Sequence, residues 1–148
     1  MSTPPFPPGE IQRLLGAALQ AHQRGDLSAA EPLYRQVLRG APNHFDALHY
    51  LGVLQAQKGD NEDAVKLIGK AISINAGSPA AYSNHGNALR DLKRYKEALA
   101  SYDKAIALNP QYANAFYNRG NTLQILGRPR EALASYDRAV QLKGDFAE

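Results

Sequence analysis

The 148-residue sequence contains no cysteine and no tryptophan, and charge of neither sign dominates it. The absence of cysteine excludes a disulfide-stapled fold, a cysteine-ligated zinc site and a cysteine nucleophile. Seventeen Lys and Arg residues against fourteen Asp and Glu residues leave a formal net charge of +3. Nucleic-acid-binding domains concentrate positive charge more strongly than this. We therefore expect no nucleic-acid partner.

Long hydrophobic runs are also missing. No apolar stretch approaches the roughly 20 residues that a transmembrane helix requires, and residues 1–10 lack the basic and apolar regions of a signal peptide. Hydrophobic residues nevertheless make up 44% of the chain, which is too many for a disordered protein. The sequence predicts a folded, cytoplasmic protein with no membrane partner.

Self-similarity at a fixed spacing is the dominant positive feature. The heptapeptide EALASYD occurs at residues 97–103 and again 34 residues later, at 131–137. Shifting the sequence by 34 residues defines four repeats, which are 11–44, 45–78, 79–112 and 113–146. A proline-rich segment, residues 1–10, precedes them. Residues 147–148 follow, and we interpret them as the start of a truncated further unit.

Each repeat has the pattern of two helices. Apolar and small residues recur at steps of three and four, which is helical spacing, and turn residues such as Gly25-Asp26 interrupt the pattern near its middle. The sequence therefore predicts an all-α fold with helices over residues 8–24, 27–39, 44–58, 61–74, 79–92, 95–108, 111–126 and 129–143.

Small residues at the eighth position of the repeats predict where helices cross. Three repeats have glycine there, Gly52, Gly86 and Gly120, and glycine lets two helix backbones approach closely. A larger side chain at position 24 of each repeat is expected to fill the remaining space. These side chains are Tyr34, Ile68, Tyr102 and Tyr136.

The order of a bulky residue, glycine, alanine, tyrosine and proline on a 34-residue period resembles the tetratricopeptide repeat (TPR). The resemblance covers nearly the whole chain. It departs from the family pattern at His85 and Arg119, where leucine is usual, at Ala76 and Gly144, where proline is usual, and in having no tryptophan at position 4 of any repeat. It implies a right-handed superhelical solenoid of four antiparallel helix hairpins, with the first helices on the inner wall. It also implies a role in protein–protein interaction.

The residues that catalysis requires do not form a recognisable constellation. His44 and His49 are five residues apart, an awkward separation for one metal ion on a helix. Glu97 and Glu131 fall in the first turns of predicted helices, where negative charge complements the helix dipole. We predict that the chain is not an enzyme, with no catalytic residue, metal site or cofactor.

Side chains on the first helix of each repeat that are not needed for packing form a candidate binding face. Four asparagines stand at equivalent positions of the last two repeats, and each amide offers both a donor and an acceptor to the main chain of an extended peptide. This row resembles the asparagine ladder in the repeat arm of O-linked N-acetylglucosamine transferases. The predicted peptide-binding residues are Asn84, Asn87, Asn118, Asn121, His49, Tyr50, Val53, Ser83, Arg90, Tyr117 and Gln124.

Other uses of these residues stay open. The asparagines can instead bond between adjacent repeats or face water. Asn87 and Asn118 also match the carboxylate clamp of chaperone co-factors, but Ser83 replaces its first lysine, so we do not predict a clamp. The basic cluster at Arg90, Lys93, Arg94 and Lys96 is interpreted as a solvated edge.

The predicted function is a non-catalytic module that binds a protein or peptide in its concave groove. One alternative is the substrate-recognition arm of a larger enzyme such as a glycosyltransferase. Another is a scaffold that self-associates through uncapped terminal repeats, because Leu133, Tyr136 and Val140 are expected to lie partly uncovered. In that alternative the proline-rich segment, with Phe6 as an aromatic anchor, is a further candidate for docking into a groove.

Overall fold

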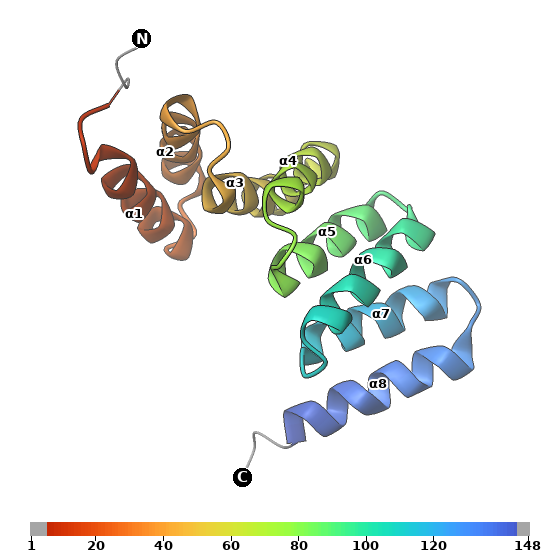
Figure 1. The fold of residues 1–148 in the computed structure, drawn as a ribbon. Helices are drawn as coiled ribbons and strands as arrows, with labels where there is room; N and C mark the ends of the chain where they lie inside the picture. The colour runs from red at the N-terminus through yellow and green to blue at the C-terminus, as the bar shows by residue number, and fades with distance from the viewer. Residues whose placement is uncertain (1–5, 145–148) are drawn as a thin grey trace. The chain divides into compact units, whose positions relative to one another are not determined.

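The computed structural model describes residues 6–144, and these residues form eight α-helices joined by short loops (Figure 1). The predicted all-α fold of antiparallel helix hairpins is confirmed, and every helix begins and ends within two residues of its predicted bounds. The predicted further unit at residues 147–148 lies outside the described residues. The helices are α1 (Glu10–Gln23), α2 (Leu27–Gly40), α3 (Phe45–Gln57), α4 (Asn61–Ile74), α5 (Pro79–Asp91), α6 (Tyr95–Leu108), α7 (Ala113–Ile125) and α8 (Pro129–Gly144).

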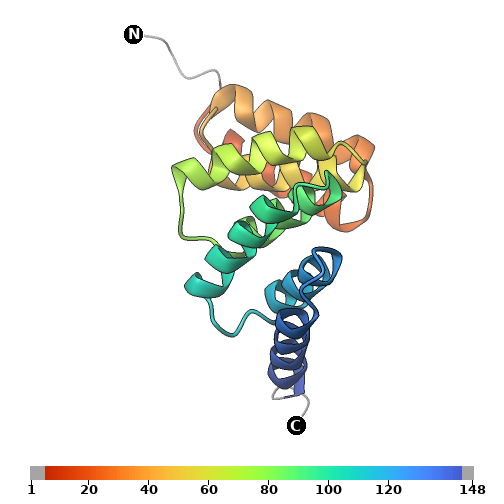
Figure 2. The ribbon, with the colours of Figure 1, turned by 90° about the vertical axis from the view of Figure 1, so that its right-hand side faces the viewer.

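The chain forms two compact units, residues 1–75 and 76–148. The first contains α1 to α4 and the second contains α5 to α8. Within each hairpin the two helices pack side by side, as Figure 2 shows after a quarter turn. The two hairpins of a unit are joined by contacts of α2 with α3 in the first unit and of α6 with α7 in the second.

Helix starts are encoded by capping residues in the first three hairpins. The side chains of Asp26, Asp60 and Ser78 each accept a hydrogen bond, at 3.1 Å, from the backbone N–H three residues later. Such caps satisfy donors that have no partner inside the helix. At the start of α8 Arg128 donates two side-chain hydrogen bonds to Glu131, at 2.6 and 2.8 Å. These hydrogen bonds lower the pKa of Glu131.

The predicted helix crossings are confirmed at the three glycines. A Cβ atom added to Gly52 would lie 2.5 Å from Cγ1 of Ile68, and one added to Gly86 would lie 2.7 Å from Cε1 of Tyr102. Gly120 faces Tyr136 in the same way, at 2.8 Å. The side chain at position 24 of each of these repeats therefore packs onto the glycine of its own hairpin.

Gly86→Ala is expected to destabilise the protein by about 1–3 kcal/mol, because Tyr102 is fully buried and cannot move aside. Gly16→Ala is the matched control, since Gly16 lies exposed in α1 with no atom within 4 Å of an added Cβ. Alanine there should stabilise the protein by about 0.5–1 kcal/mol through helix propensity alone. Urea titrations followed by circular dichroism measure both changes. Equal effects of the two substitutions would refute the close crossing.

The turn inside each hairpin requires a left-handed backbone residue. Gly25, Gly59 and Gly127 occupy this position with φ between 73° and 89°, whereas the third hairpin has Lys93 there with φ of 63°. A side chain in this region costs about 1 kcal/mol relative to glycine. Lys93→Gly should therefore raise the free energy of unfolding by a few tenths to about 1 kcal/mol, as measured by urea denaturation. A loss of stability would show that the lysine side chain makes a contact that outweighs the backbone strain.

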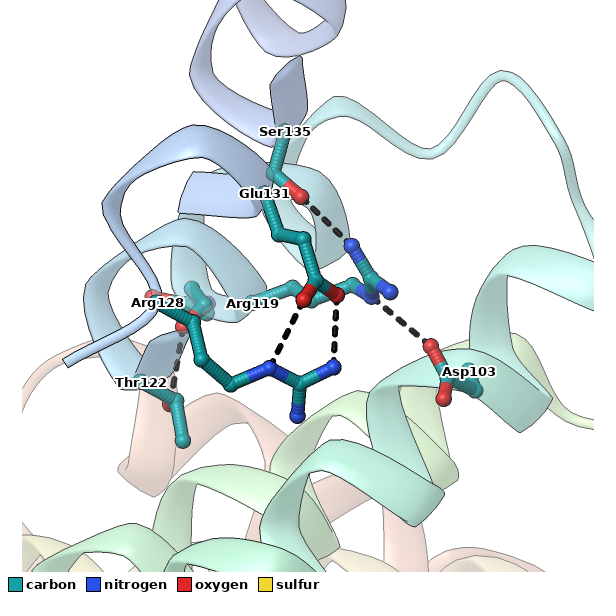
Figure 3. A network of polar contacts seen from close by, with 7 residues as sticks. Asp103, Arg119, Thr122, Arg128, Glu131 and Ser135 are labelled. Carbon is teal, nitrogen blue, oxygen red and sulfur yellow. Dashed lines mark hydrogen bonds and ion pairs between the residues drawn. The ribbon is translucent and has the colours of Figure 1, made fainter. Parts of the chain in front are cut away.

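The two residues that stand where leucine is usual, His85 and Arg119, are each matched by a serine on the partner helix. His85 Nδ1 lies 3.0 Å from Ser101 Oγ, and Arg119 donates to Ser135 Oγ at 2.8 Å. Arg119 also pairs with Asp103 on α6 at 2.8 Å, beside the Arg128–Glu131 pair (Figure 3). A polar pair thus fills the place that apolar side chains take in the first two repeats.

Phe6 packs within the first unit. A methyl group added to Gly40, at the end of α2, would overlap the Phe6 ring and the Ile11 side chain. The aromatic anchor that the sequence offered for docking in a groove is therefore occupied by its own first hairpin. This contact corrects the expectation that Phe6 is available to another surface.

Candidate functional site

The second unit presents a polar face built from its first helices, α5 and α7. Asn84, Asn87, Asn118 and Asn121 are all half-buried there, and Tyr117 and Gln124 are exposed. Side chains from α6 and α8 reach the same face and fix the orientation of the asparagine amides.

Two of the asparagines accept a hydrogen bond from a tyrosine of their own hairpin. The Tyr102 hydroxyl donates to Asn87 Oδ1 at 2.6 Å, and the Tyr136 hydroxyl donates to Asn121 Oδ1. Burial raises the pKa of Tyr102 to about 12, so the hydroxyl keeps its proton at neutral pH. Each tyrosine therefore holds the amide oxygen, and the amide nitrogen points elsewhere.

A third asparagine is held by a neighbouring helix. Arg90 of α5 donates to Asn118 Oδ1 of α7 at 3.3 Å, and Arg90 also lies 3.5 Å from Asp91. The oxygens of Asn87, Asn118 and Asn121 are thus all used inside the protein. Within the described residues their Nδ2 groups have no hydrogen-bond partner. We call these three residues the donor row, because they offer N–H groups.

An aromatic surface borders the donor row. Half of the Tyr117 surface is exposed, and its ring lies 5.7 Å from the Tyr136 ring. The Lys143 ammonium group lies 5.9 Å from the centre of the Tyr117 ring, a cation–π distance. The Tyr136 hydroxyl is also 3.1 Å from Gln124 Oε1. Donors, an aromatic ring and positive charge therefore meet in one unit.

The corresponding face of the first unit is more apolar. The Tyr34 and Tyr50 rings stack with centroids 6.4 Å apart, and Val53, three residues after Tyr50, is half-buried. His22 joins the helices, because its ring nitrogens lie 2.8 Å from the Tyr34 hydroxyl and 2.7 Å from Gln57 Oε1. Of the residues predicted in this unit, Tyr50 and Val53 remain partly accessible.

Two predicted site residues are wrong as peptide contacts. His49 is 5% exposed and Ser83 is 2% exposed. The rings of Phe45 and Tyr50 flank His49 at 5.8 and 5.3 Å, and this burial lowers the pKa of His49 by disfavouring the charged form. Ser83 is too short to extend beyond its neighbours. Neither side chain reaches a ligand from where it lies.

Sequence reasoning missed the tyrosines as parts of the site. Tyr102, Tyr136 and Lys143 come from second helices, which were assigned to packing. A signal was present, however. Both repeats that carry asparagine at position 9 carry tyrosine at position 24; the second repeat pairs Val53 with Ile68, and the first pairs Leu19 with Tyr34. A hydroxyl and an amide that occur together indicate a hydrogen bond.

Metal binding and membrane insertion find no support in the described part of the chain. No group of three or more histidine and acidic side chains there could hold a metal ion. None of its helices is both long and apolar enough to cross a bilayer.

Comparison with known proteins gives several matches. A family model described as a TPR repeat matches residues 86–127, and two models described as tetratricopeptide repeat match residues 21–84 and 113–146. The comparison with curated protein sequences found no match.

Solved structures match over most of the chain. The crystal structure of MamA is 28% identical with a TM-score of 0.80, over 87% of this chain and 75% of that one. An O-GlcNAc transferase mutant from Thermobaculum terrenum is 30% identical with a TM-score of 0.76, over 83% of this chain but 23% of the transferase chain. YrrB, described as a TPR protein with an unusual peptide-binding site, is 22% identical with a TM-score of 0.81, over 91% of this chain and 70% of its own.

The family matches and the structure agree on the repeat. Together the three matched regions run from residue 21 to residue 146 with one residue left out, and they span the end of α1 and the helices α2 to α8. The glycine crossings and the tyrosine at position 24 are the packing features on which the resemblance rested. This chain belongs to the tetratricopeptide repeat family.

Proposed function

We propose that this protein-interaction module is non-catalytic and binds an extended peptide on the donor row of its second unit. The observation that carries the proposal is the orientation of three amides, Asn87, Asn118 and Asn121. Their oxygens accept hydrogen bonds from Tyr102, Arg90 and Tyr136, so their N–H groups remain for a ligand.

A peptide main chain supplies the complementary group. Its carbonyl oxygens accept hydrogen bonds whatever the side chains are, so a row of fixed donors binds the backbone. Fixing the donors in advance lowers the entropic cost of binding. The exposed Tyr117 ring offers an apolar contact beside the row. In the first unit, Tyr50 and Val53 are proposed to contact apolar side chains of a ligand.

One alternative places the same binding mode in a larger enzyme, where the repeats select protein substrates. The 30% identity with the transferase from Thermobaculum terrenum supports this alternative. This alternative requires the same donor row. It differs in that the bound peptide is then a substrate for the catalytic domain of the enzyme.

The scaffold alternative receives mixed support. Leu133 and Val140 are 60% and 70% exposed on α8, which favours self-association, as the sequence predicted. Against end-to-end stacking, α1 and its C-cap present polar residues, namely Arg13, Gln20 and the C-cap Arg24, and all three are exposed. Sedimentation over a concentration series distinguishes the scaffold from the peptide-binding module, because a scaffold must self-associate and a binding module need not.

A displayed library of random 12-residue peptides tests the proposal. We expect selected binders to be extended, and we expect alanine substitutions along them to have small effects except at positions that contact Tyr117. Binders whose affinity depends mainly on acidic side chains, and falls steeply with salt, would contradict backbone recognition.

A further inference from the structure

A pocket in the second unit lies between α6 and the turn that joins α7 to α8. Its volume is about 410 Å³, and ligand pockets in proteins usually measure about 300–1,000 Å³. The residues that line it are Lys96, Leu99, Ala100 and Asp103 of α6 and Leu126 and Arg128 of the turn. Four of these six are exposed, so the pocket is open to solvent. None of them belongs to the donor row, and the pocket is therefore separate from the peptide site proposed above.

The most buried residues of the pocket are its two leucines. Leu99 is only 8% exposed and packs in one cluster with Leu123 and Ala132. Leu126 is half-buried and lies against the same cluster. A side chain that enters the pocket therefore meets aliphatic carbon, and burial of an apolar side chain there favours binding.

The charged residues of the pocket are paired with one exception. Asp103 accepts a hydrogen bond from Arg119 at 2.8 Å (Figure 3). Arg128 donates to Glu131 at 2.6 and 2.8 Å (Figure 3). Lys96 is exposed and forms no ion pair with any residue that the structure describes. The pocket thus combines two leucines with one uncompensated positive charge.

In the first unit an ion pair occupies the equivalent place. Lys58 stands at the position in its repeat that Leu126 holds in the last repeat, and Glu31 likewise matches Leu99. Lys58 donates to Glu31 at 2.7 Å, and Glu31 also accepts from Arg35 at 3.2 Å. The same arrangement of helices is therefore compatible with charged residues at these two positions. The pair of leucines is a property of the second unit and not a requirement of the repeat.

We propose that this pocket binds a segment of a partner protein in which phenylalanine or leucine stands next to acidic residues. The apolar side chain enters the pocket against Leu99 and Leu126, and a carboxylate pairs with the Lys96 ammonium group. Charge complementarity identifies the partner, because the other charges of the pocket are already paired and a basic segment would be repelled by Lys96. The openness of the pocket favours a side chain presented by another protein over a small molecule, which its site usually encloses.

Three short peptides with blocked ends provide the probes. They are acetyl-Gly-Phe-Glu-Glu-Gly-amide, a second peptide with lysine in place of both glutamates, and a third with alanine in place of phenylalanine. We expect the first peptide to shift the ¹³C-methyl resonances of Leu99 and Leu126, with a dissociation constant on the order of 1 mM. The second and third peptides should each bind at least about tenfold more weakly, because each lacks one of the two contacts.

A charge exchange makes the test specific. Lys96→Glu should weaken binding of the Phe-Glu-Glu peptide at least about tenfold and should allow the Phe-Lys-Lys peptide to bind. The variant is expected to fold, because Lys96 lies in the first turn of α6, where negative charge complements the helix dipole. Lys66→Glu makes the same charge change at an exposed position of α4 and should leave binding of the Phe-Glu-Glu peptide unchanged.

The donor row supplies the remaining control. Asn87→Asp/Asn121→Asp should leave binding of the Phe-Glu-Glu peptide unchanged, and a loss of binding would show that the peptide occupies the donor row instead. Leu99 and Leu126 methyl resonances that stay in place, equal binding of the glutamate and lysine peptides, or binding that survives Lys96→Glu would each overturn the inference. These outcomes leave the proposal for the donor row unaffected.

Discussion

Replacement of Tyr102 by alanine is expected to lower the free energy of unfolding of the second unit by about 3–5 kcal/mol. The Tyr102 side chain is fully buried and lies against Gly86, and its hydroxyl donates to Asn87. Removing the Tyr102 side chain leaves a cavity, because the packed helices around it cannot move together to fill the space. The substitution also leaves the Asn87 oxygen without its hydrogen-bond donor.

Tyr136→Ala is the matched control, because Tyr136 holds the same sixth position of the repeated heptapeptide as Tyr102, also donates to an asparagine, and is only half-buried. It should cost about 1–2 kcal/mol. Urea unfolding followed by circular dichroism at 222 nm measures both. A cost for Tyr136→Ala as large as that for Tyr102→Ala would contradict the difference in burial.

Exchange of Asn87 and Asn121 for aspartate is expected to lower affinity for a selected peptide by about 10–100-fold. Aspartate keeps the oxygen that accepts from Tyr102 or Tyr136, but it replaces the N–H donors with a carboxylate oxygen. Each lost hydrogen bond accounts for about 0.5–1.5 kcal/mol, and a factor of ten corresponds to about 1.4 kcal/mol. Calorimetry measures the loss.

Asn43→Asp/Asn109→Asp adds the same two charges at exposed loop positions, and Asn109 likewise uses its side-chain oxygen inside the protein, accepting from Gln111 N–H at 3.0 Å. This control should bind normally, and both double variants should unfold at nearly the wild-type temperature. If Lys93→Ala/Arg94→Ala instead causes the larger loss of peptide affinity, and if that affinity falls steeply with salt, the basic cluster is the binding site.

The helix positions could be predicted from the sequence because local patterns determine them. The 34-residue period, the turn glycines and the spacing of small residues placed every helix end to within two residues. Even the crossings at Gly52, Gly86 and Gly120 followed from residue size. Both the helix ends and the crossings depend on residues within a single hairpin, which lie close together in the sequence.

The details of the site depend on contacts between helices and could not be predicted in the same way. A helical wheel places His49 on an open face, but it does not show that the rings of Phe45 and Tyr50 close over it. The sequence also shows that the Asn87 amide can both donate and accept a hydrogen bond. It does not show that the amide oxygen accepts from the Tyr102 hydroxyl. The donor row is therefore a property of the folded unit.

The side-chain amide resonances of Asn87, Asn118 and Asn121 provide the most direct test of peptide binding. In a ¹⁵N-labelled sample titrated with a selected peptide, the three Nδ2–H₂ groups should shift as the complex forms, because they change from water to carbonyl partners. The Asn43 and Asn109 amides should stay in place. Three unmoved donor-row amides, in a sample where the peptide is demonstrably bound, would contradict the account.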